Sequence, residues 1–108
     1  MKVPVSFRTL HGMADKNTLV DCGATDNFIH PRLIKRLGLG TRKLRTPRNM
    51  WNIDGTLNQL GVLTHFTDLE VQTGKEERKM RFYVTELGAE DLILGYPWLA
   101  QFEPRFKW

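Results

Sequence analysis

The sequence predicts a small all-β fold, either a barrel or a sandwich, that carries one or two short helices. Turn-forming residues recur about every ten positions, and the segments between them are short and rich in β-branched and aromatic residues. With 41% hydrophobic and 26% charged residues in a chain of 108, we expect one globular domain over residues 1–108. The turn signals are His11-Gly12, residues 15–17, Asp54-Gly55, Thr73-Gly74 and Gly88-Ala89.

Several segments have the pattern of β-strands. Apolar residues alternate with polar or small ones near the N-terminus and again in the second half of the chain, as expected of strands with one buried face. The segments are the stretch with Val3, Val5 and Phe7, and residues 18–20, 62–71 and 80–85. The last two flank Thr73-Gly74, which predicts a β-hairpin.

Two segments predict helices instead. Pro31 suits the first turn of a helix and Gly38 suits its C-terminal cap, with apolar residues on one face between them. Pro97 opens a second helical turn, which we expect Pro104 to end. The apolar residues are Leu33, Ile34 and Leu37 in the first segment and Trp98, Leu99 and Phe102 in the second.

Composition excludes several classes of protein. No apolar run approaches the ~20 residues of a membrane span, and the N-terminus has no stretch of signal-peptide type. A single cysteine, Cys22, excludes an internal disulfide and a Cys-rich zinc site, and it fits a reducing compartment. The net charge of +4 allows nucleic-acid binding, but the basic residues are scattered, and solvated surfaces explain them better.

Residues 18–29, TLVDCGATDNFI, predict a functional site. A β-prone run delivers Asp21 into a turn of very small residues, which lets another backbone approach closely. An acid at the end of a strand in such a turn is placed for chemistry. The alternative is that Asp21 only caps the turn through its own backbone.

A second segment, DLILGYPWL at residues 91–99, predicts a fully buried strand that ends against another part of the chain. Its apolar triplet runs directly into Gly95 and then into a turn that begins with proline. The alternative, a core strand followed by a C-terminal helix, is compatible with the same prediction. The informative feature is the combination of an acid, a small turn, a hairpin and a hydrophobic-hydrophobic-glycine segment in this order.

This combination resembles the retropepsin-type aspartic proteases, and most closely the protease segment of Ty3/gypsy-type retrotransposon polyproteins. The resemblance covers residues 3–108 and implies a small closed barrel with a flap hairpin. We expect a segment of a longer polyprotein, with a further C-terminal strand missing. The segments that carry it are VDCGAT, DNFIHPRLIKRLGL, NIDGTLNQLGVLTHFTDLEVQTG, RFYVTELG and DLILGYPWLAQFEPRFKW.

The resemblance implies an aspartic endopeptidase that is active as a homodimer, with Asp21 supplied by each subunit. Two close carboxylates share a proton; one activates a water and the other polarises the scissile carbonyl. No metal or cofactor is needed. The only other Asp-Gly sequence, Asp54-Gly55, is better explained as a hairpin tip, so one chain offers only half of a site.

The resemblance also assigns roles to neighbouring residues. Residues 49–61 correspond to a flap that closes over an extended peptide, and Trp51 either shields the cleft or packs at the flap base. The assigned residues are Cys22, Gly23 and Ala24 as support of the catalytic loop; Thr25, Asp26, Ile53, Asp54, Gly55 and Thr56 as the substrate-binding set; and Ile93, Leu94 and Gly95 as the second signature behind the loop.

Cys22 departs from the family pattern, which has Ser or Thr after the catalytic aspartate. In the family that hydroxyl hydrogen-bonds across the dimer axis, whereas a thiol is larger and a weak donor and acceptor. We therefore expect weaker support of the loop, with the pair of aspartates retained. Two copies of Cys22 near a two-fold axis could also be oxidised to a cross-link if their geometry allowed it.

Three functions from different classes follow. The first is a dimeric aspartic peptidase that processes its own polyprotein inside the cell, in the cytoplasm, without membrane or nucleic-acid partners. The second is a catalytically weakened retropepsin-like module for dimerisation or peptide binding, which Cys22 favours. The third is a basic nucleic-acid-binding domain, which the core-type spacing of the aromatic residues disfavours. A cysteine nucleophile with His11, His30 or His65 as its base lacks any local signature.

Overall fold

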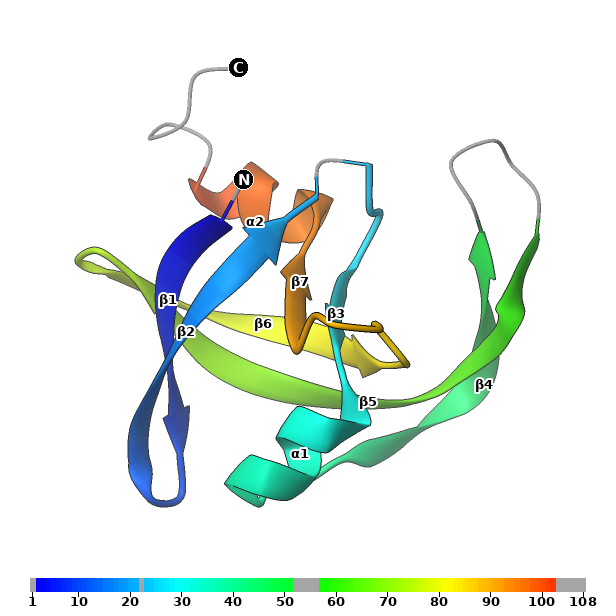
Figure 1. Ribbon diagram of the computed structural model, residues 1–108, viewed down its shortest axis with the longest axis horizontal. Coiled ribbons are helices and arrows are strands. Elements are labelled where there is room, and N and C mark those ends of the chain that lie inside the picture. Colours follow the sequence, from blue (N-terminus) through cyan, green and yellow to red (C-terminus); the bar gives the residue numbers. More distant parts are fainter. Residues whose placement is uncertain (1, 22, 52–56, 103–108) are drawn as a thin grey trace.

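The computed structural model describes residues 2–21, 23–51 and 57–102, which form seven strands and two short helices (Figure 1). The elements are β1 (Lys2–Thr9), β2 (Gly12–Val20), β3 (Asn27–Ile29), α1 (Pro31–Leu37), β4 (Arg42–Trp51), β5 (Leu57–Thr73), β6 (Glu76–Val84), β7 (Leu92–Leu94) and α2 (Tyr96–Phe102). The predicted class, mostly β with short helices, is confirmed.

The strands close into a barrel. Their order in the sheet is β1-β2-β7-β3-β6-β5-β4, and an additional pairing of β1 with β5 closes the barrel and leaves β4 outside it. Two pairs are parallel, β2 with β7 and β3 with β6, and the other pairs are antiparallel. Of the two architectures that the sequence allowed, the structure is therefore the barrel.

β4 and the beginning of β5 form an arm that leaves the barrel. In Figure 1 this arm rises on the same side as the turn that follows β2. Its strands pair antiparallel from Arg42 opposite Phe66 to Trp51 opposite Leu57. The expected flap, residues 49–61, falls at the end of this arm, and its predicted tip lies outside the described residues.

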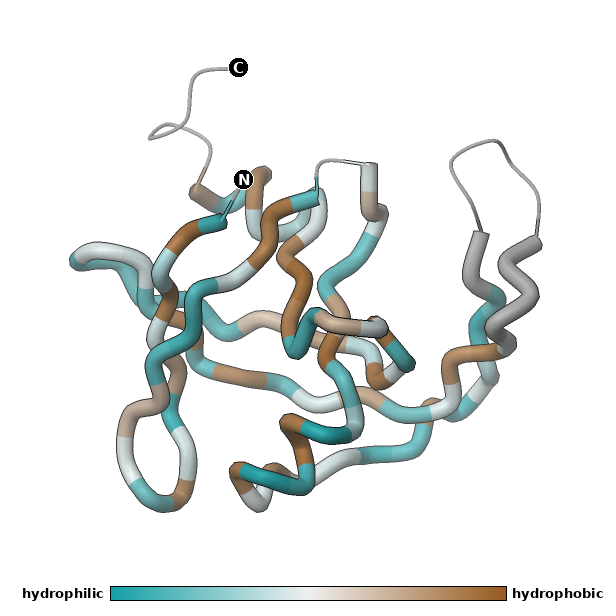
Figure 2. Tube along the Cα trace, in the orientation of Figure 1, coloured by the Kyte–Doolittle hydropathy of each residue, from teal (hydrophilic) through white to brown (hydrophobic). Residues whose placement is uncertain are grey.

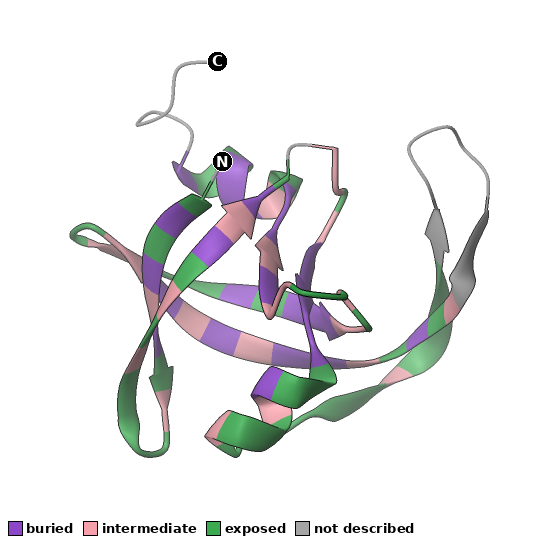
Figure 3. Cartoon of the chain, viewed as in Figure 1, coloured by how far each residue is buried: buried purple, intermediate pink, exposed green. Residues whose placement is uncertain are grey.

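The core explains why the alternating sequence forms strands. In β1, Val3, Val5 and Phe7 are buried and their neighbours are more exposed, an alternation visible along β1 in Figure 3. β7 is apolar throughout and runs through the middle of the fold, where Figure 2 shows it as a hydrophobic segment. Trp98 and Phe102 of α2 are fully buried against the same core, with their ring centroids 5.4 Å apart.

The first helix has the caps that the sequence predicts. The ring Nδ1 of His30 accepts a hydrogen bond from the Arg32 N–H at 2.9 Å and caps the N-terminus. Gly38 ends the helix in the left-handed conformation, with φ of 63°. Leu33 is buried, whereas Ile34 and Leu37 pack against the core from a partly buried position. The helix that the sequence predicts between Pro31 and Gly38 is confirmed as α1.

Other expectations need correction. The expected strand at residues 18–20 is the end of a nine-residue strand, and the turn signal at residues 15–17 is wrong. Asp15 lies opposite Ser6 on β1 and accepts a hydrogen bond from its hydroxyl at 2.6 Å, so a cross-strand contact overrides the turn preference. The second helix begins at Tyr96, one residue before the expected proline.

Candidate active site

Asp21 lies at the end of β2, in a turn held by backbone hydrogen bonds. Its N–H donates to the Leu94 carbonyl at 2.9 Å, which extends the parallel pairing of β2 and β7 by one residue. The Ala24 N–H donates to the Asp21 carbonyl at 3.0 Å and closes the turn. The side chain of Asp21 is exposed in the single chain. The fold thus presents a carboxylate on a fixed backbone.

The two oxygens of the Asp21 carboxylate have different surroundings. Oδ1 accepts the Gly23 N–H at 3.0 Å, which is the interaction of a turn-capping aspartate. Among the described residues no donor reaches Oδ2, so this oxygen is available to another molecule. The capping interpretation is therefore correct for Oδ1 and does not account for Oδ2.

The segment after β7 packs directly behind this turn. An added Cβ on Gly95 would lie 2.3 Å from the Asp26 carbonyl oxygen and 2.7 Å from that of Ala24, distances that no side chain tolerates. The next residue, Tyr96, donates its N–H to the Ala24 carbonyl at 2.9 Å. The close approach predicted from the apolar triplet and its glycine is confirmed.

Asn27 joins these two segments and was not among the predicted site residues. Its side chain is 1% exposed, its Oδ1 accepts the Gly95 N–H at 2.9 Å, and its Nδ2 donates to the Arg81 carbonyl at 3.4 Å. The amide satisfies a backbone N–H that would otherwise be buried without a partner. The available signal was a polar residue at the head of an apolar strand.

Asp26 connects the turn to the arm. Its Oδ2 accepts a bond from the Thr25 hydroxyl at 3.3 Å and one from Arg48 Nη2 at 3.4 Å. Arg48, in β4, also donates to the hydroxyl of Tyr83 and lies over that ring, 4.8 Å from its centroid. This contact, which the sequence did not indicate, couples the turn to the strand that leads toward the expected flap.

The structure brings together one part of the predicted site. Asp21 and Ala24 lie against the predicted second signature, in which Ile93 and Leu94 belong to β7 and Gly95 follows it. Gly23 contacts the Asp21 carboxylate. Cys22 and the expected flap residues Ile53, Asp54, Gly55 and Thr56 lie outside the described residues. Trp51 belongs to β4.

Two of the three histidines make local contacts. His30 caps α1 through Nδ1 and lies 3.6 Å from Glu86 through Nε2, and His65 Nδ1 contacts the Thr64 hydroxyl at 2.8 Å. Within residues 2–21, 23–51 and 57–102, no group of three or more His, Cys, Asp or Glu side chains is arranged to hold a metal ion. Over the same residues, no helix has the length and apolar character needed to cross a membrane.

Comparison with known proteins agrees with this architecture. The chain matches the family model of the PEG10/RTL1 protease domain over residues 17–108, and it belongs to that family. Among solved structures it is similar to the EIAV protease in complex with the inhibitor HBY-793, with a TM-score of 0.67 and 17% identity over 95% of this chain and 88% of that one. It is also similar to the retroviral protease-like domain of Ddi1 from Leishmania major, with a TM-score of 0.64 and 20% identity over 95% of this chain and 77% of the other.

These findings define a retropepsin-like protease domain. The family match gives the kind of domain, and the two structural matches show that the barrel is that of retroviral proteases. The retropepsin-type fold expected from the sequence is confirmed.

Proposed function

We propose that this domain is an aspartic endopeptidase that is active as a homodimer, with one Asp21 from each subunit. The observation that carries the proposal is Asp21 itself, exposed on a turn that is fixed from behind by Leu94 and Gly95, with one carboxylate oxygen available. Within the described part of the chain there is one such turn. A second copy related by a two-fold axis would supply the other carboxylate.

The chemistry of the paired site follows from two carboxylates that share one proton. The ionised member removes a proton from a water held between them, and this water attacks the scissile carbonyl. The protonated member polarises the carbonyl oxygen, and a proton then passes to the leaving amine. The reaction needs neither a covalent intermediate nor a cofactor.

Neighbouring residues would orient the peptide. Gly23 and Ala24 would shape the turn, Thr25 and Asp26 would contact the substrate backbone, and the expected flap with Ile53, Asp54, Gly55 and Thr56 would close over an extended chain. The motifs that resemble Ty3/gypsy-type proteases support a role in processing a retrotransposon polyprotein, in the cytoplasm. The second signature supports the catalytic loop.

The test is cleavage of a mixed peptide library between pH 4 and pH 7, compared with the Asp21→Asn variant. We expect cleavage by the unmodified chain, inhibition by pepstatin, and a loss of at least about 10³-fold in kcat in the variant. Sedimentation should show the same dimer for both. Absence of cleavage at concentrations where the dimer is present would contradict the proposal.

The alternative function is a dimerisation or peptide-binding module whose catalysis has weakened, and it rests on Cys22. Replacing Cys22 by Ser restores the hydroxyl of the family pattern, so kcat/KM should stay the same or rise by up to about tenfold. The measurement is kcat/KM on a peptide selected from the library. A large loss in the variant would show that this position has another role.

A further inference from the structure

The arm carries a groove that the proposed catalytic chemistry does not use. It has a volume of about 610 Å³ and is lined by Arg42, Lys43, Leu44, Arg45, Thr46, Arg48, Phe66 and Arg81. Five of these eight residues are basic and none is acidic. We call this feature the arm groove.

The groove results from an irregularity in the pairing of β4 with β5. Lys43 lies opposite His65 and Arg48 lies opposite Leu63, so β4 advances five residues while β5 advances two. The extra residues bulge away from the sheet and leave a hollow beside Phe66.

The charge of the groove is concentrated and only partly neutralised. Four of its five basic residues come from residues 42–48, a stretch that contains no acidic residue. Among the described residues, Arg48 pairs with Asp26 and Arg81 pairs with Asp68, but Arg42, Lys43 and Arg45 form no ion pair. All three are exposed. The groove therefore has three positive charges available to a ligand.

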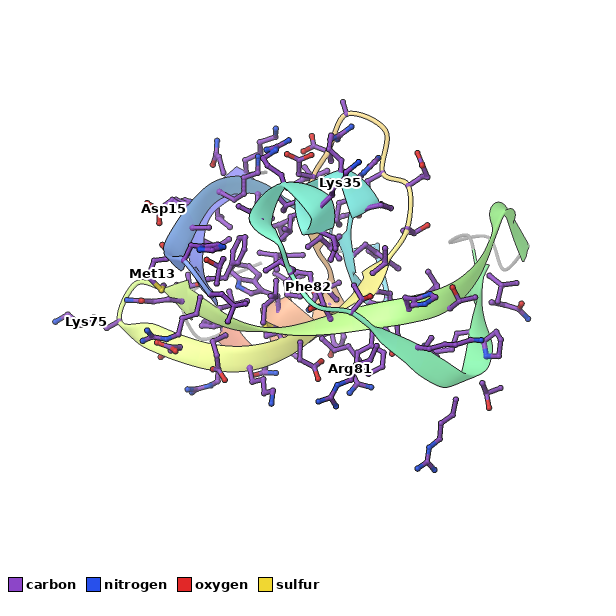
Figure 4. The ribbon with its side chains drawn as sticks, turned by 90° about the horizontal axis from the view of Figure 1, so that it is seen from below. Met13, Asp15, Lys35, Lys75, Arg81 and Phe82 are labelled. Carbon is purple, nitrogen blue, oxygen red and sulfur yellow. The ribbon has the colours of Figure 1, made fainter. Side chains whose placement is uncertain are left out.

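The simplest explanation for charged residues on an edge strand is that they prevent aggregation. Two observations indicate that these residues also bind a ligand. Scattered charges would serve that purpose, whereas here they surround one hollow on one side of the sheet. Figure 4 shows Arg81 on the outer side of the strands and its neighbour Phe82 on the inner side. The same groove reaches Arg48, which contacts Asp26 of the candidate active site. Arg48 thus links the groove to the turn that contains Asp26.

The aromatic residues decide which kind of polyanion fits. Single-stranded nucleic acids are bound by basic residues together with open aromatic faces on which bases stack. Here Arg81 lies 3.8 Å from the centroid of the Phe66 ring and Arg48 covers Tyr83, and each ring is 8% exposed. Guanidinium groups bind carboxylates in a planar, two-pronged geometry. The groove favours carboxylate side chains of a peptide.

We infer that the arm groove binds an acidic segment of a polypeptide, as an accessory site for the region that flanks the cleaved bond. The accessory role rests on the proposed function, because it requires a peptidase. Binding of the acidic segment does not require catalysis. The substrate class is thus a protein with several Asp or Glu residues beside its cleavage site.

The binding test uses the full chain with Asp21→Asn, so that the probe is not cut. The probe is a fluorescent peptide of eight glutamates, compared with one of eight glutamines. The first variant is Arg42→Gln/Lys43→Gln/Arg45→Gln. The matched control is Lys35→Gln/Lys75→Gln/Arg78→Gln, which removes the same charge from exposed positions; Figure 4 shows Lys35 and Lys75 away from Arg81. Circular dichroism confirms that each variant is folded.

We expect the glutamate peptide to bind the chain that carries only Asp21→Asn. Its Kd should rise about tenfold in the groove variant and less than about twofold in the control variant. Binding should weaken with added salt. Equal losses in both variants, absence of binding, or equal binding of the glutamine peptide would overturn the inference. A 20-nucleotide oligothymidine that binds more tightly and depends on the same three residues would also overturn it, in favour of nucleic acid.

The cleavage test separates this inference from the proposed function. Four glutamates appended to a cleavable peptide should lower KM about fivefold for the unmodified chain and not for the groove variant. If the peptide is cleaved with the same KM with and without the glutamates, the accessory role is overturned and the proposed peptidase is not. Binding that depends on the groove in a chain that cleaves nothing supports the groove and overturns the peptidase.

Discussion

The two ends of β7 are held by different kinds of interaction, although only three residues separate them. At its C-terminal end, Gly95 is enclosed by backbone carbonyls and its N–H is bound by the buried amide of Asn27. At its N-terminal end, Asp91 forms ion pairs with Lys16 at 2.7 Å, Arg32 at 2.8 Å and Arg36 at 3.6 Å. The first end supports the candidate active site, and the second attaches α1 to the barrel.

The difference determines how each end responds to acid. Amide and backbone hydrogen bonds do not titrate, so the support behind Asp21 is independent of pH. The Asp91 cluster depends on an ionised carboxylate. Hydrogen bonding from Lys16 lowers the pKa of Asp91 to about 2; desolvation opposes this shift, and hydrogen bonding from Arg32 reinforces it. The support that does not titrate thus lies behind Asp21, where the proposed peptidase would need a geometry that persists in acid.

The largest expected effect is at Gly95. Gly95→Ala places a methyl group 2.3 Å from the Asp26 carbonyl oxygen, and the backbone on both sides has to move. We expect a loss of about 3 kcal/mol or more in the free energy of unfolding, measured by urea denaturation, together with loss of cleavage. Gly40→Ala is the control, because nothing lies within 4 Å of its Cβ and no positive φ is involved. Equal stability of the two variants would contradict the close packing behind the turn.

The next effect is at Asn27. Asn27→Ala removes two hydrogen bonds and leaves the buried Gly95 N–H without a partner, which should cost about 2 to 3 kcal/mol. Exposed Asn49→Ala is the matched control. The loss should be the same at pH 4 and pH 7, measured by thermal unfolding. A loss that varied strongly with pH would show that charge contributes to the support of the turn.

A smaller effect, with the opposite pH behaviour, is expected at Asp91. The pKa of Asp91 in the folded state lies below its usual value of 3.8, so the stabilisation by Asp91 is fully present above about pH 4 and disappears as pH falls toward 2. Asp91→Asn should therefore cost about 1 to 2 kcal/mol at pH 7 and almost nothing at pH 2. Acid titration of the unfolding free energy measures both values.

The control for this prediction is Glu77→Gln on the β5–β6 hairpin. Hydrogen bonding from Arg8 lowers the pKa of Glu77, but the pair is exposed and solvent screens it. We expect no resolvable change in stability at any pH. If Glu77→Gln and Asp91→Asn had equal effects, the partial burial of Asp91 would not be the reason for its larger contribution.

The candidate site was predictable in its main features because each has a local cause. A short acid-containing turn after an apolar run and a glycine after LIL are visible in the sequence, and the structure places them together as expected. Asn27 and Arg48 were not predicted, because their importance lies in partners 68 and 22 residues away. The local sequence around Asn27 signals only a polar residue at the head of an apolar strand, and the sequence around Arg48 signals nothing.

The lengths of the strands likewise depend partly on local sequence and partly on distant partners. The sequence indicated only residues 18–20 of β2, because Asp15 and Asn17 are turn-forming residues; pairing along the whole of β1 makes them part of a strand. Apart from its last residues, which fall in the expected flap, β4 was not predicted, because its basic residues show no alternation. It is a strand because β5 extends beyond the barrel to pair with it.

By itself the sequence determined the mostly β class, both short helices, the β5–β6 hairpin and the juxtaposition of an aspartate turn with a glycine-ended strand. These depend on spacing, turn chemistry and caps, which act over a few residues. Only the tertiary structure decided that the sheet closes through β1 and β5, that Asn27 fixes Gly95, and that a bulge turns scattered basic residues into a groove. Each of these is a contact between distant segments, whose energy exists only once the barrel has formed.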